Sequence, residues 1–265
     1  GLYKGRKLGT IGDIGAMSMM SGKSFAIGEA GMFCTDSEEY IYKARLWSSY
    51  ARFRDVPKNL WAGTLNVPFG GIKNRLNQCT CAVGIEQLKK YDAECADIDK
   101  AMKYFHEGIK DVKCIKMIYP KWENSTKAGW YSSRAVYVPE ENQGIDVRVF
   151  AQALIAETTK KGFSAGCNFP LHWSSLYDNE DIFGDGVPPC RRGGQDPKKL
   201  WGKLPVSEAT NAHCMGVPWF RYFDKAVIDR YIEATHKVVK NADALKKYTG
   251  QAPWAYWESG WQRDI

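Results

Sequence analysis

The sequence predicts a mixed α/β fold, and two kinds of segment carry this prediction. Short apolar runs next to glycines, such as Ala16–Met20 and Met32–Cys34, are too short for helices and are typical of strands. Longer segments repeat apolar residues in steps of three and four, as amphipathic helices do, over residues 88–109 and 224–247. A chain of 265 residues is long enough for one large domain or two modest domains with a core.

The first predicted strand, Ala16–Met20, leads to Lys23, which is flanked by small residues. Burial disfavours a charged ammonium, so a lysine at the end of a buried strand has a more nucleophilic amine. Such lysines form Schiff bases with aldehydes, including that of pyridoxal phosphate. The alternative is an ordinary solvated loop lysine, and the spacing alone does not separate the two interpretations.

The tripeptide Gly22-Lys23-Ser24 is also similar to the end of a phosphate-binding P-loop. That motif requires a glycine five residues before Gly22, and position 17 is a methionine. The P-loop interpretation is therefore disfavoured.

Three short motifs follow one another around Lys23. They are Gly12-Asp-Ile-Gly15, Ser18 five residues before Lys23, and Gly28-Glu-Ala-Gly31. In this order they resemble the DegT/DnrJ/EryC1 family of aminotransferases, which are fold-type-I (aspartate aminotransferase-like) pyridoxal-phosphate enzymes acting on keto-sugars or aminocyclitol precursors. The resemblance implies that Lys23 is the catalytic lysine that binds the cofactor as a Schiff base. It also implies that Ser18 donates a hydrogen bond to the cofactor phosphate.

The resemblance implies a domain organisation as well. Residues 1–110 correspond to the C-terminal part of the cofactor-binding large domain with a long connecting helix, residues 111–250 to a small C-terminal α/β domain, and residues 251–265 to an aromatic tail that matches no known pattern. The family's acid at the pyridine nitrogen, its ring-stacking aromatic and its phosphate-binding helix would lie upstream of Gly1. We therefore expect a C-terminal part of a longer enzyme, incomplete without an upstream segment or a partner chain.

Local signals predict the remaining elements in order. Thr35–Glu39 supplies a capping residue followed by acids, which predicts a helix over about residues 37–52. The stripe over residues 88–109 predicts a helix of roughly six turns. The second half of the chain shows strands near residues 114–118, 135–138 and 163–166, helices over 146–157 and 224–247, and a short helix followed by a strand over 204–220.

The segment before the long helix, Lys73-Asn74-Arg75, is similar to the family's Asn-Tyr-Arg-Met loop, in which the asparagine reaches the partner subunit's cofactor phosphate. Counting without gaps places Lys73 at the asparagine position and Asn74 at the tyrosine position, which departs from the family pattern. Lys73 could bind phosphate as a point charge, or Asn74 could if the loop shifts by one residue. Arg75 matches the arginine and is a candidate substrate ligand. The alternative is that these residues only cap the following helix.

Two further candidates lie in the second half of the chain. Asn168–Trp173 is comparable to a Pro-x-His segment of the family that folds over the active site, which makes His172 a candidate substrate ligand, although a lone histidine is more often structural. Residues 175–195 form a long polar loop and a possible specificity lid, with Arg191 and Arg192 available to an anionic substrate. A solvated surface loop is the alternative.

Composition narrows the function classes. The net charge of +7 is mild and dispersed, and no basic run with interleaved aromatics indicates nucleic-acid binding. The eight cysteines form no Cys-x-x-Cys pair and do not cluster with the four histidines, so no metal site is expected. No segment is long and apolar enough for a membrane span, and no signal peptide is visible, so we expect a cytoplasmic protein.

Taken with the resemblance, these observations predict a transaminase that transfers an amino group from glutamate or glutamine to a keto-sugar, such as a sugar nucleotide, or to a cyclitol ketone, as in antibiotic biosynthesis. A homodimer, or a heteromer with a chain that supplies the missing part, is expected. Alternatives are a non-catalytic or regulatory partner subunit of the same fold and a related dehydratase. In that dehydratase a histidine occupies the lysine position, so Lys23 argues against it.

Overall fold

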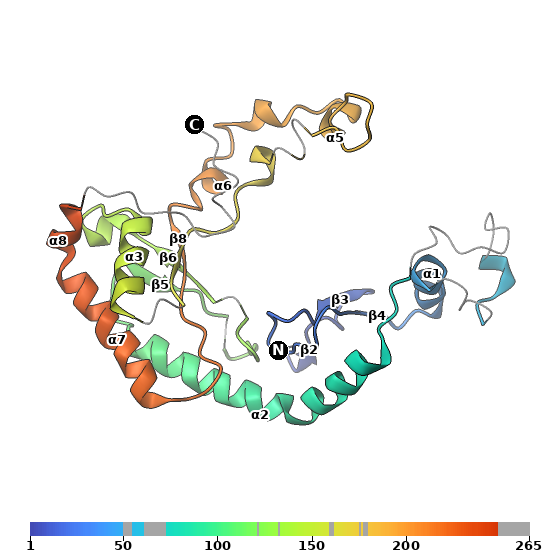
Figure 1. The fold of residues 1–265 in the computed structure, drawn as a ribbon, viewed down its shortest axis with the longest axis horizontal. Helices are drawn as coiled ribbons and strands as arrows, with labels where there is room; N and C mark the ends of the chain where they lie inside the picture. Colours follow the sequence, from blue (N-terminus) through green and yellow to red (C-terminus); the bar gives the residue numbers. More distant parts are fainter. Residues whose placement is uncertain are drawn as a thin grey trace. The chain divides into compact units, whose positions relative to one another are not determined.

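The computed structural model describes residues 1–49, 55–60, 73–120, 122–131, 133–158, 162–174, 176 and 180–248 (Figure 1). The chain separates into two compact units. Unit 1 comprises Gly1–Asp99 and Tyr119–Tyr131, and unit 2 comprises Lys100–Ile118 and Ser132–Ile265. The division falls inside a helix after Asp99, whereas the sequence analysis places it at residues 110–111. The predicted aromatic tail, residues 251–265, lies outside the described residues.

Unit 1 begins with two small hairpins. Strands β1 (Leu2–Tyr3) and β2 (Arg6–Lys7) pair across a turn in which Lys4 and Gly5 both have positive φ, as tight hairpin turns require. Strands β3 (Gly15–Ser18) and β4 (Gly31–Cys34) form the second antiparallel pair, in the register Ala16↔Phe33 and Ser18↔Gly31.

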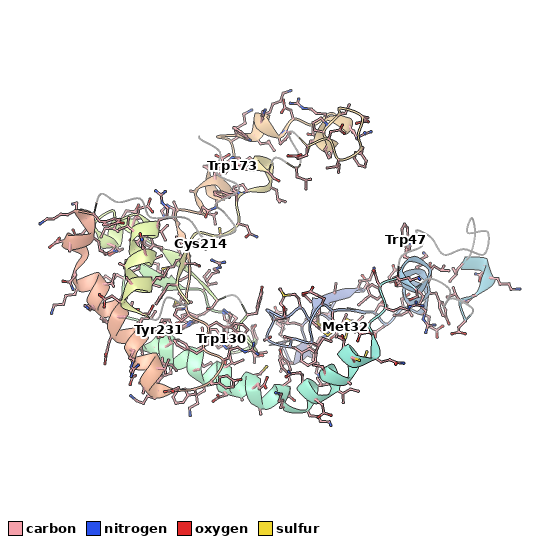
Figure 2. All side chains as sticks on the ribbon, in the orientation of Figure 1. Met32, Trp47, Trp130, Trp173, Cys214 and Tyr231 are labelled. Atoms are coloured by element: carbon pink, nitrogen blue, oxygen red, sulfur yellow. The ribbon has the colours of Figure 1, made fainter. Side chains whose placement is uncertain are left out.

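The β3–β4 hairpin differs from the buried strand that the sequence predicts. Ala16 and Ser18 are exposed, and so are Met32 and Phe33 on β4 (Figure 2). A two-stranded sheet is too small to cover both of its own faces, so alternate side chains remain accessible. The expectation of a dry strand at this position is wrong for the described residues.

Two helices complete unit 1. Helix α1 (Glu38–Ser48) begins where predicted, because the Ser37 side chain accepts a hydrogen bond from the Tyr40 amide. Its end at Ser48 is earlier than expected, and residues 50–54 lie outside the described residues. A single 3-10 turn, η1 (Lys58–Leu60), follows. Unit 1 also holds the first part of α2 (Gln78–Gly108), a helix of 31 residues.

The apolar stripe of α2 is exposed at one end of the helix and buried at the other. Leu88 is 64% exposed, whereas Ile98, Met102, Phe105 and Ile109 at its other end are buried. The predicted helix is therefore confirmed, but within the described residues its stripe is buried only from Ile98 onward, at the end of the part in unit 1 and along the part in unit 2.

Unit 2 contains a four-stranded antiparallel sheet in the order β5-β6-β8-β7. Its strands are β5 (Ile115–Met117), β6 (Arg134–Tyr137), β7 (Ser164–Ala165) and β8 (Cys214–Gly216). Helix α3 (Val147–Glu157), capped by the Asp146 side chain, packs against β7, β8 and helix α7 (Lys225–Lys240), and the short α8 (Ala242–Lys246) follows α7 (Figure 1).

The core of unit 2 lies between this sheet and these helices. Phe150 of α3 stacks on Tyr137 of β6 with ring centroids 5.0 Å apart, and Tyr231 of α7 packs edge-on against Phe220 (Figure 2). Short helical turns occupy the connections: η3 (Pro139–Asn142), η4 (Leu171–Trp173), α5 (Pro189–Arg192), η5 (Pro197–Leu200) and α6 (Pro205–Ala209). Among the described residues, none of the helices combines the length and apolarity that crossing a membrane requires.

Candidate active site

The loop that carries Lys23 is an extension of the β3–β4 hairpin. After Ser18, the Met19 amide donates to the Ala30 carbonyl and the Met19 carbonyl accepts from the Ile27 amide, so the loop closes by backbone pairing. Within it, the Lys23 amide donates to the Met20 carbonyl at 2.9 Å. The Ser18 hydroxyl accepts from the Met20 amide at 3.4 Å. The sequence motif of Ser18 and Lys23 therefore lies on one hydrogen-bonded turn.

Two side chains next to Lys23 attach this loop to α2. The Ser24 and Tyr91 hydroxyl oxygens lie 3.0 Å apart, within hydrogen-bonding distance. The ring of Phe25 packs edge-on against the same Tyr91, with centroids 5.1 Å apart. The two residues that follow Lys23 therefore connect the loop to α2, in addition to the backbone pairing within the loop.

The segment Tyr119–Tyr131 approaches Lys23 from another part of the chain. A Cβ atom added to Gly129 would fall 2.2 Å from the Ser24 Cβ, so the Gly129 backbone packs directly against the Ser24 side chain. Two residues later, the Tyr131 ring lies under the Lys23 amine, with 3.9 Å between Nζ and the ring centroid. This is a cation–π arrangement.

Lys23 is half-buried, in contrast to the dry pocket that the sequence analysis expects. Ser21 and Gly22 beside it are exposed, because the hairpin is covered on few sides. Among the described residues no carboxylate forms an ion pair with Lys23. Its amine is therefore partly accessible, and no described carboxylate holds it in a salt bridge.

The predicted phosphate loop, Lys73–Arg75, also belongs to unit 1. Lys73 forms an isolated backbone bridge with Ser49, and the Asn74 amide donates to the Ser48 carbonyl at 2.8 Å. All three side chains of the loop are exposed. The α2 N-terminus is instead capped by Asn77, whose side-chain oxygen accepts from the Thr80 amide at 2.8 Å. Phosphate binding by Lys73 or Asn74, and substrate binding by Arg75, stay predictions.

His172 lies in unit 2 and is buried. Its Nε2 is 2.9 Å from Glu208 Oε1, and the same carboxylate oxygen accepts from the Gly202 amide. The Trp201 indole donates to the His172 carbonyl at 3.0 Å. One ring nitrogen is thus engaged inside the protein, as in a structural histidine, and a substrate role for His172 stays a prediction.

A cavity of 760 Å³ lies beside His172, within unit 2. Its lining includes Leu171, Leu200 and Leu204, together with Cys190, Gly194, Gln195, Asp196, Pro197 and Lys199. Neither Arg191 nor Arg192 lines it: the Arg191 guanidinium lies 3.0 Å from the Asp196 carboxylate, and Arg192 pairs with Asp185. Both arginines of the predicted lid are therefore engaged by acids of their own loop.

Sequence reasoning missed Tyr131, Gly129 and Tyr91 as neighbours of Lys23. Nothing in their local sequence marks them, because their contacts come from segments far from Lys23 in the chain. The run Trp130–Tyr131 after a glycine was the available signal, and it indicates only a turn with aromatic side chains.

With this geometry in place, comparison with known proteins decides the family. Residues 2–185 match the DegT/DnrJ/EryC1/StrS aminotransferase family. The chain belongs to this family. A curated relative from Streptoalloteichus tenebrarius, provisionally named an L-glutamine:3-amino-2,3-dideoxy-scyllo-inosose aminotransferase, is 25% identical over 258 residues, or 92% of this chain and 57% of the relative. The chain spans about half the length of the curated relatives it matches.

Solved structures similar to this chain have the same fold. A provisionally named sugar aminotransferase from Streptococcus pneumoniae, in its PMP form, superposes with a TM-score of 0.65 at 18% identity, covering 93% of this chain and 56% of that one. The E. coli GDP-4-keto-6-deoxy-D-mannose-3-dehydratase, with bound hydrated PLP, gives 0.61 at 16% identity, covering 88% and 57%. These likenesses confirm the predicted class, the aspartate aminotransferase-like fold type I of pyridoxal-phosphate enzymes.

Proposed function

We propose that this chain belongs to a pyridoxal-phosphate-dependent aminotransferase that acts on a keto-sugar or a cyclitol ketone, with glutamate or glutamine as the amino donor. The observation that carries the proposal is Lys23 on its hydrogen-bonded turn, in a chain of the aminotransferase family. The name of the S. tenebrarius relative, which specifies glutamine and an amino-inosose, supports the donor and acceptor classes.

The residues on the turn carry the chemical groups that binding of a phosphorylated aldehyde requires. Lys23 supplies an accessible amine without an ion pair to a described carboxylate, and exposed Ser18 supplies a hydroxyl that can donate to a phosphate oxygen. Lys73 and Asn74, exposed in the same unit, are the proposed additional phosphate ligands. Arg75, Arg191 and His172 are the proposed substrate ligands.

In this proposal Lys23 has two successive tasks. With pyridoxal phosphate bound, Lys23 Nζ would hold the cofactor by its aldehyde carbon until the amino group of the donor took its place. As a free amine, Lys23 would then accept the proton of the donor α-carbon as a general base. Bound pyridoxal phosphate supplies the electron sink that makes this carbon acidic. The tight turn keeps Lys23 Nζ close to the place of both tasks.

A second candidate is a non-catalytic or regulatory partner subunit of the same fold. The exposed faces of the β3–β4 hairpin favour it, because the described residues around Lys23 do not enclose a cofactor by themselves. In either case we propose a cytoplasmic homodimer or heteromer in which further polypeptide completes the site. Size-exclusion chromatography with light scattering would measure the assembly.

Trapping of the cofactor tests the proposal. The purified chain is mixed with pyridoxal phosphate, its visible absorption is recorded, and borohydride is added. The Lys23 amine displaces the aldehyde oxygen as water, and the reductant converts the new bond to a stable secondary amine that peptide mapping locates. We expect the label on Lys23 and its loss in Lys23→Arg.

Lys100→Arg is the matched control, because Lys100 Nζ also lies over an aromatic ring, 4.0 Å from the Phe223 centroid, but in unit 2. That variant should keep the label on Lys23. A folded protein without any label on Lys23 would favour the partner-subunit alternative. Release of a 2-oxo acid from glutamate or glutamine in the absence of an acceptor would separate an aminotransferase from a dehydratase.

A further inference from the structure

The contact between Lys23 and Tyr131 depends on an unusual backbone. Ala128 has φ of 46° and Trp130 has φ of 51°, so both lie in the left-handed region that residues with side chains seldom adopt. For a residue as bulky as tryptophan this conformation is strained, and it persists only where surrounding contacts enforce it.

The contacts that enforce it are visible in unit 1. The Trp130 side chain is 1% exposed, its indole donates to Asp99 Oδ1 at 2.9 Å, and its amide donates to the Lys127 carbonyl at 3.1 Å. The Gly129 backbone contacts Ser24 at a separation that leaves no room for a side chain. Trp130 therefore fixes the segment to α2, while Gly129 fixes it to the residue that follows Lys23.

The consequence of this geometry is the position of Tyr131. The turn Lys127–Trp130, closed by the Trp130 amide on the Lys127 carbonyl, precedes Tyr131, whose ring centroid lies 3.9 Å from Lys23 Nζ. A lysine side chain loses much rotamer freedom when its head group is held in one place. An aromatic face attracts an ammonium without forming a bond that the amine must later break.

We propose that Tyr131 is a positioning residue for Lys23 and that the strained segment 128–131 exists to present its ring to the amine. The inference rests on the proposed function of Lys23. Tyr131 acts through the face of its ring and not through its hydroxyl group, and it holds the amine at the mouth of the turn where the cofactor aldehyde arrives.

The experiment measures how fast borohydride-trapped pyridoxal phosphate accumulates on Lys23, by peptide mapping, in the parent chain and in three variants. Tyr131→Leu removes the ring and should slow labelling of Lys23 by about two- to fivefold, the range expected for an exposed cation–π contact. Tyr131→Phe and Tyr131→Trp keep an aromatic face and should label within about twofold of the parent, tryptophan at least as fast because its face attracts cations best.

Tyr3→Leu is the matched control, since Tyr3 also lies under a lysine, with Lys4 Nζ 5.5 Å from its centroid, and is 43% exposed. It should leave Lys23 labelling unchanged. A spectroscopic readout separates positioning from a merely structural role: the achiral cofactor gains visible circular dichroism only when it is held asymmetrically. That signal per bound cofactor should weaken in Tyr131→Leu and be retained with phenylalanine or tryptophan.

The outcomes separate the two proposals. If the parent shows no label on Lys23, the proposed function fails. If the parent is labelled but Tyr131→Leu is labelled equally fast, only the positioning role of Tyr131 is overturned. If Tyr131→Leu and Tyr131→Phe slow the labelling of Lys23 equally, the effect belongs to the hydroxyl group, which also overturns the role of the ring face. If Tyr131→Leu does not fold, a folded Tyr131→Trp protein that is labelled more slowly than the parent overturns that role as well.

Discussion

The two ends of α2 bear the same apolar stripe in very different surroundings. In unit 2, Met102 and Phe105 are 0% exposed, and Ile98, next to the boundary in unit 1, is 1% exposed. At the other end of the stripe, in unit 1, Leu88 is 64% exposed. The sequence pattern is similar at both ends, so the difference comes from what each unit can place against the helix.

Unit 2 has a four-stranded sheet and the helices α3 and α7, which together enclose a core. Unit 1 has paired strands of two to four residues, which cannot cover a helix and their own two faces at once. It buries fewer apolar side chains, among them Leu46, Ile98 and Trp130, and adds close crossings at glycines, such as Gly15 against the Gly9 carbonyl and Gly129 against the Ser24 side chain. The comparison teaches that most of the hydrophobic core lies in unit 2, whereas unit 1 combines a few buried side chains with tight crossings at glycines.

The largest expected effect tests the core of unit 2. Phe150→Ala removes a fully buried ring that stacks on Tyr137, and it should lower the free energy of unfolding by about 3–5 kcal/mol. Phe33→Ala in unit 1 is the matched control, because Phe33 is 40% exposed, and about 1 kcal/mol or less is expected there. Urea unfolding would measure both. Equal losses of unfolding free energy in the two variants would show that the hairpin is as well packed as the core, and would contradict the contrast between the two units.

A somewhat smaller effect tests the backbone crossings of unit 1. The methyl group in Gly129→Ala would overlap Ser24, so the segment must shift, at a cost of about 1–3 kcal/mol. Gly12→Ala is the control, because its new methyl group would meet nothing nearer than 4.0 Å. Differential scanning calorimetry should show a lower Tm for the first variant only. A Gly129→Ala protein as stable as the parent would mean that this crossing is loose.

The attachment of Trp130 is expected to contribute less. Asp99→Ala removes the acceptor of the indole hydrogen bond, and about 1 kcal/mol should be lost from the free energy of unfolding. Asp99→Asn keeps an oxygen at the same place and should lose less. Near-ultraviolet circular dichroism of the tryptophans would follow the same order. If the two variants lost the same stability, the charge of Asp99, which both variants remove, rather than its hydrogen bond would matter.

Structural features that depend on neighbouring residues in the chain can be predicted from the sequence, whereas features that depend on segments far apart in the chain cannot. The start of α1 after its N-cap Ser37 and the two short strands on either side of the Lys23 loop are local features, and the sequence predicts them. The exposure of the hairpin is not local, because it depends on how much polypeptide packs against it.

The neighbours of Lys23 show the same limit. The contact with Tyr131 requires a close approach at Gly129 and a strained Trp130, and no periodicity or motif records either feature. His172 is similar: the family pattern marks the residue, but only the fold shows that Glu208 engages its Nε2. Motifs therefore single out Lys23 as the candidate amine, whereas the residues that lie against it can be identified only from coordinates.

The smallest expected effect concerns the pH dependence of unit 2. His236 Nε2 lies 3.0 Å from Asp111 Oδ1, and this hydrogen bond raises the pKa of His236 above its ordinary value. A histidine with a raised pKa stabilises the fold fully at pH values below its unfolded pKa of about 6.5. That contribution is lost as the pH rises through the higher folded pKa, because the neutral ring no longer attracts the carboxylate.

Between pH 6 and 8 the parent should therefore lose more stability than His236→Gln, as urea unfolding at a series of pH values would show. Because the pair is largely exposed, the difference should shrink in high salt. If the unfolding free energies of the two proteins changed with pH in parallel, the His236–Asp111 pair would contribute nothing to the stability of unit 2. The stability of unit 2 would then come from its apolar core alone.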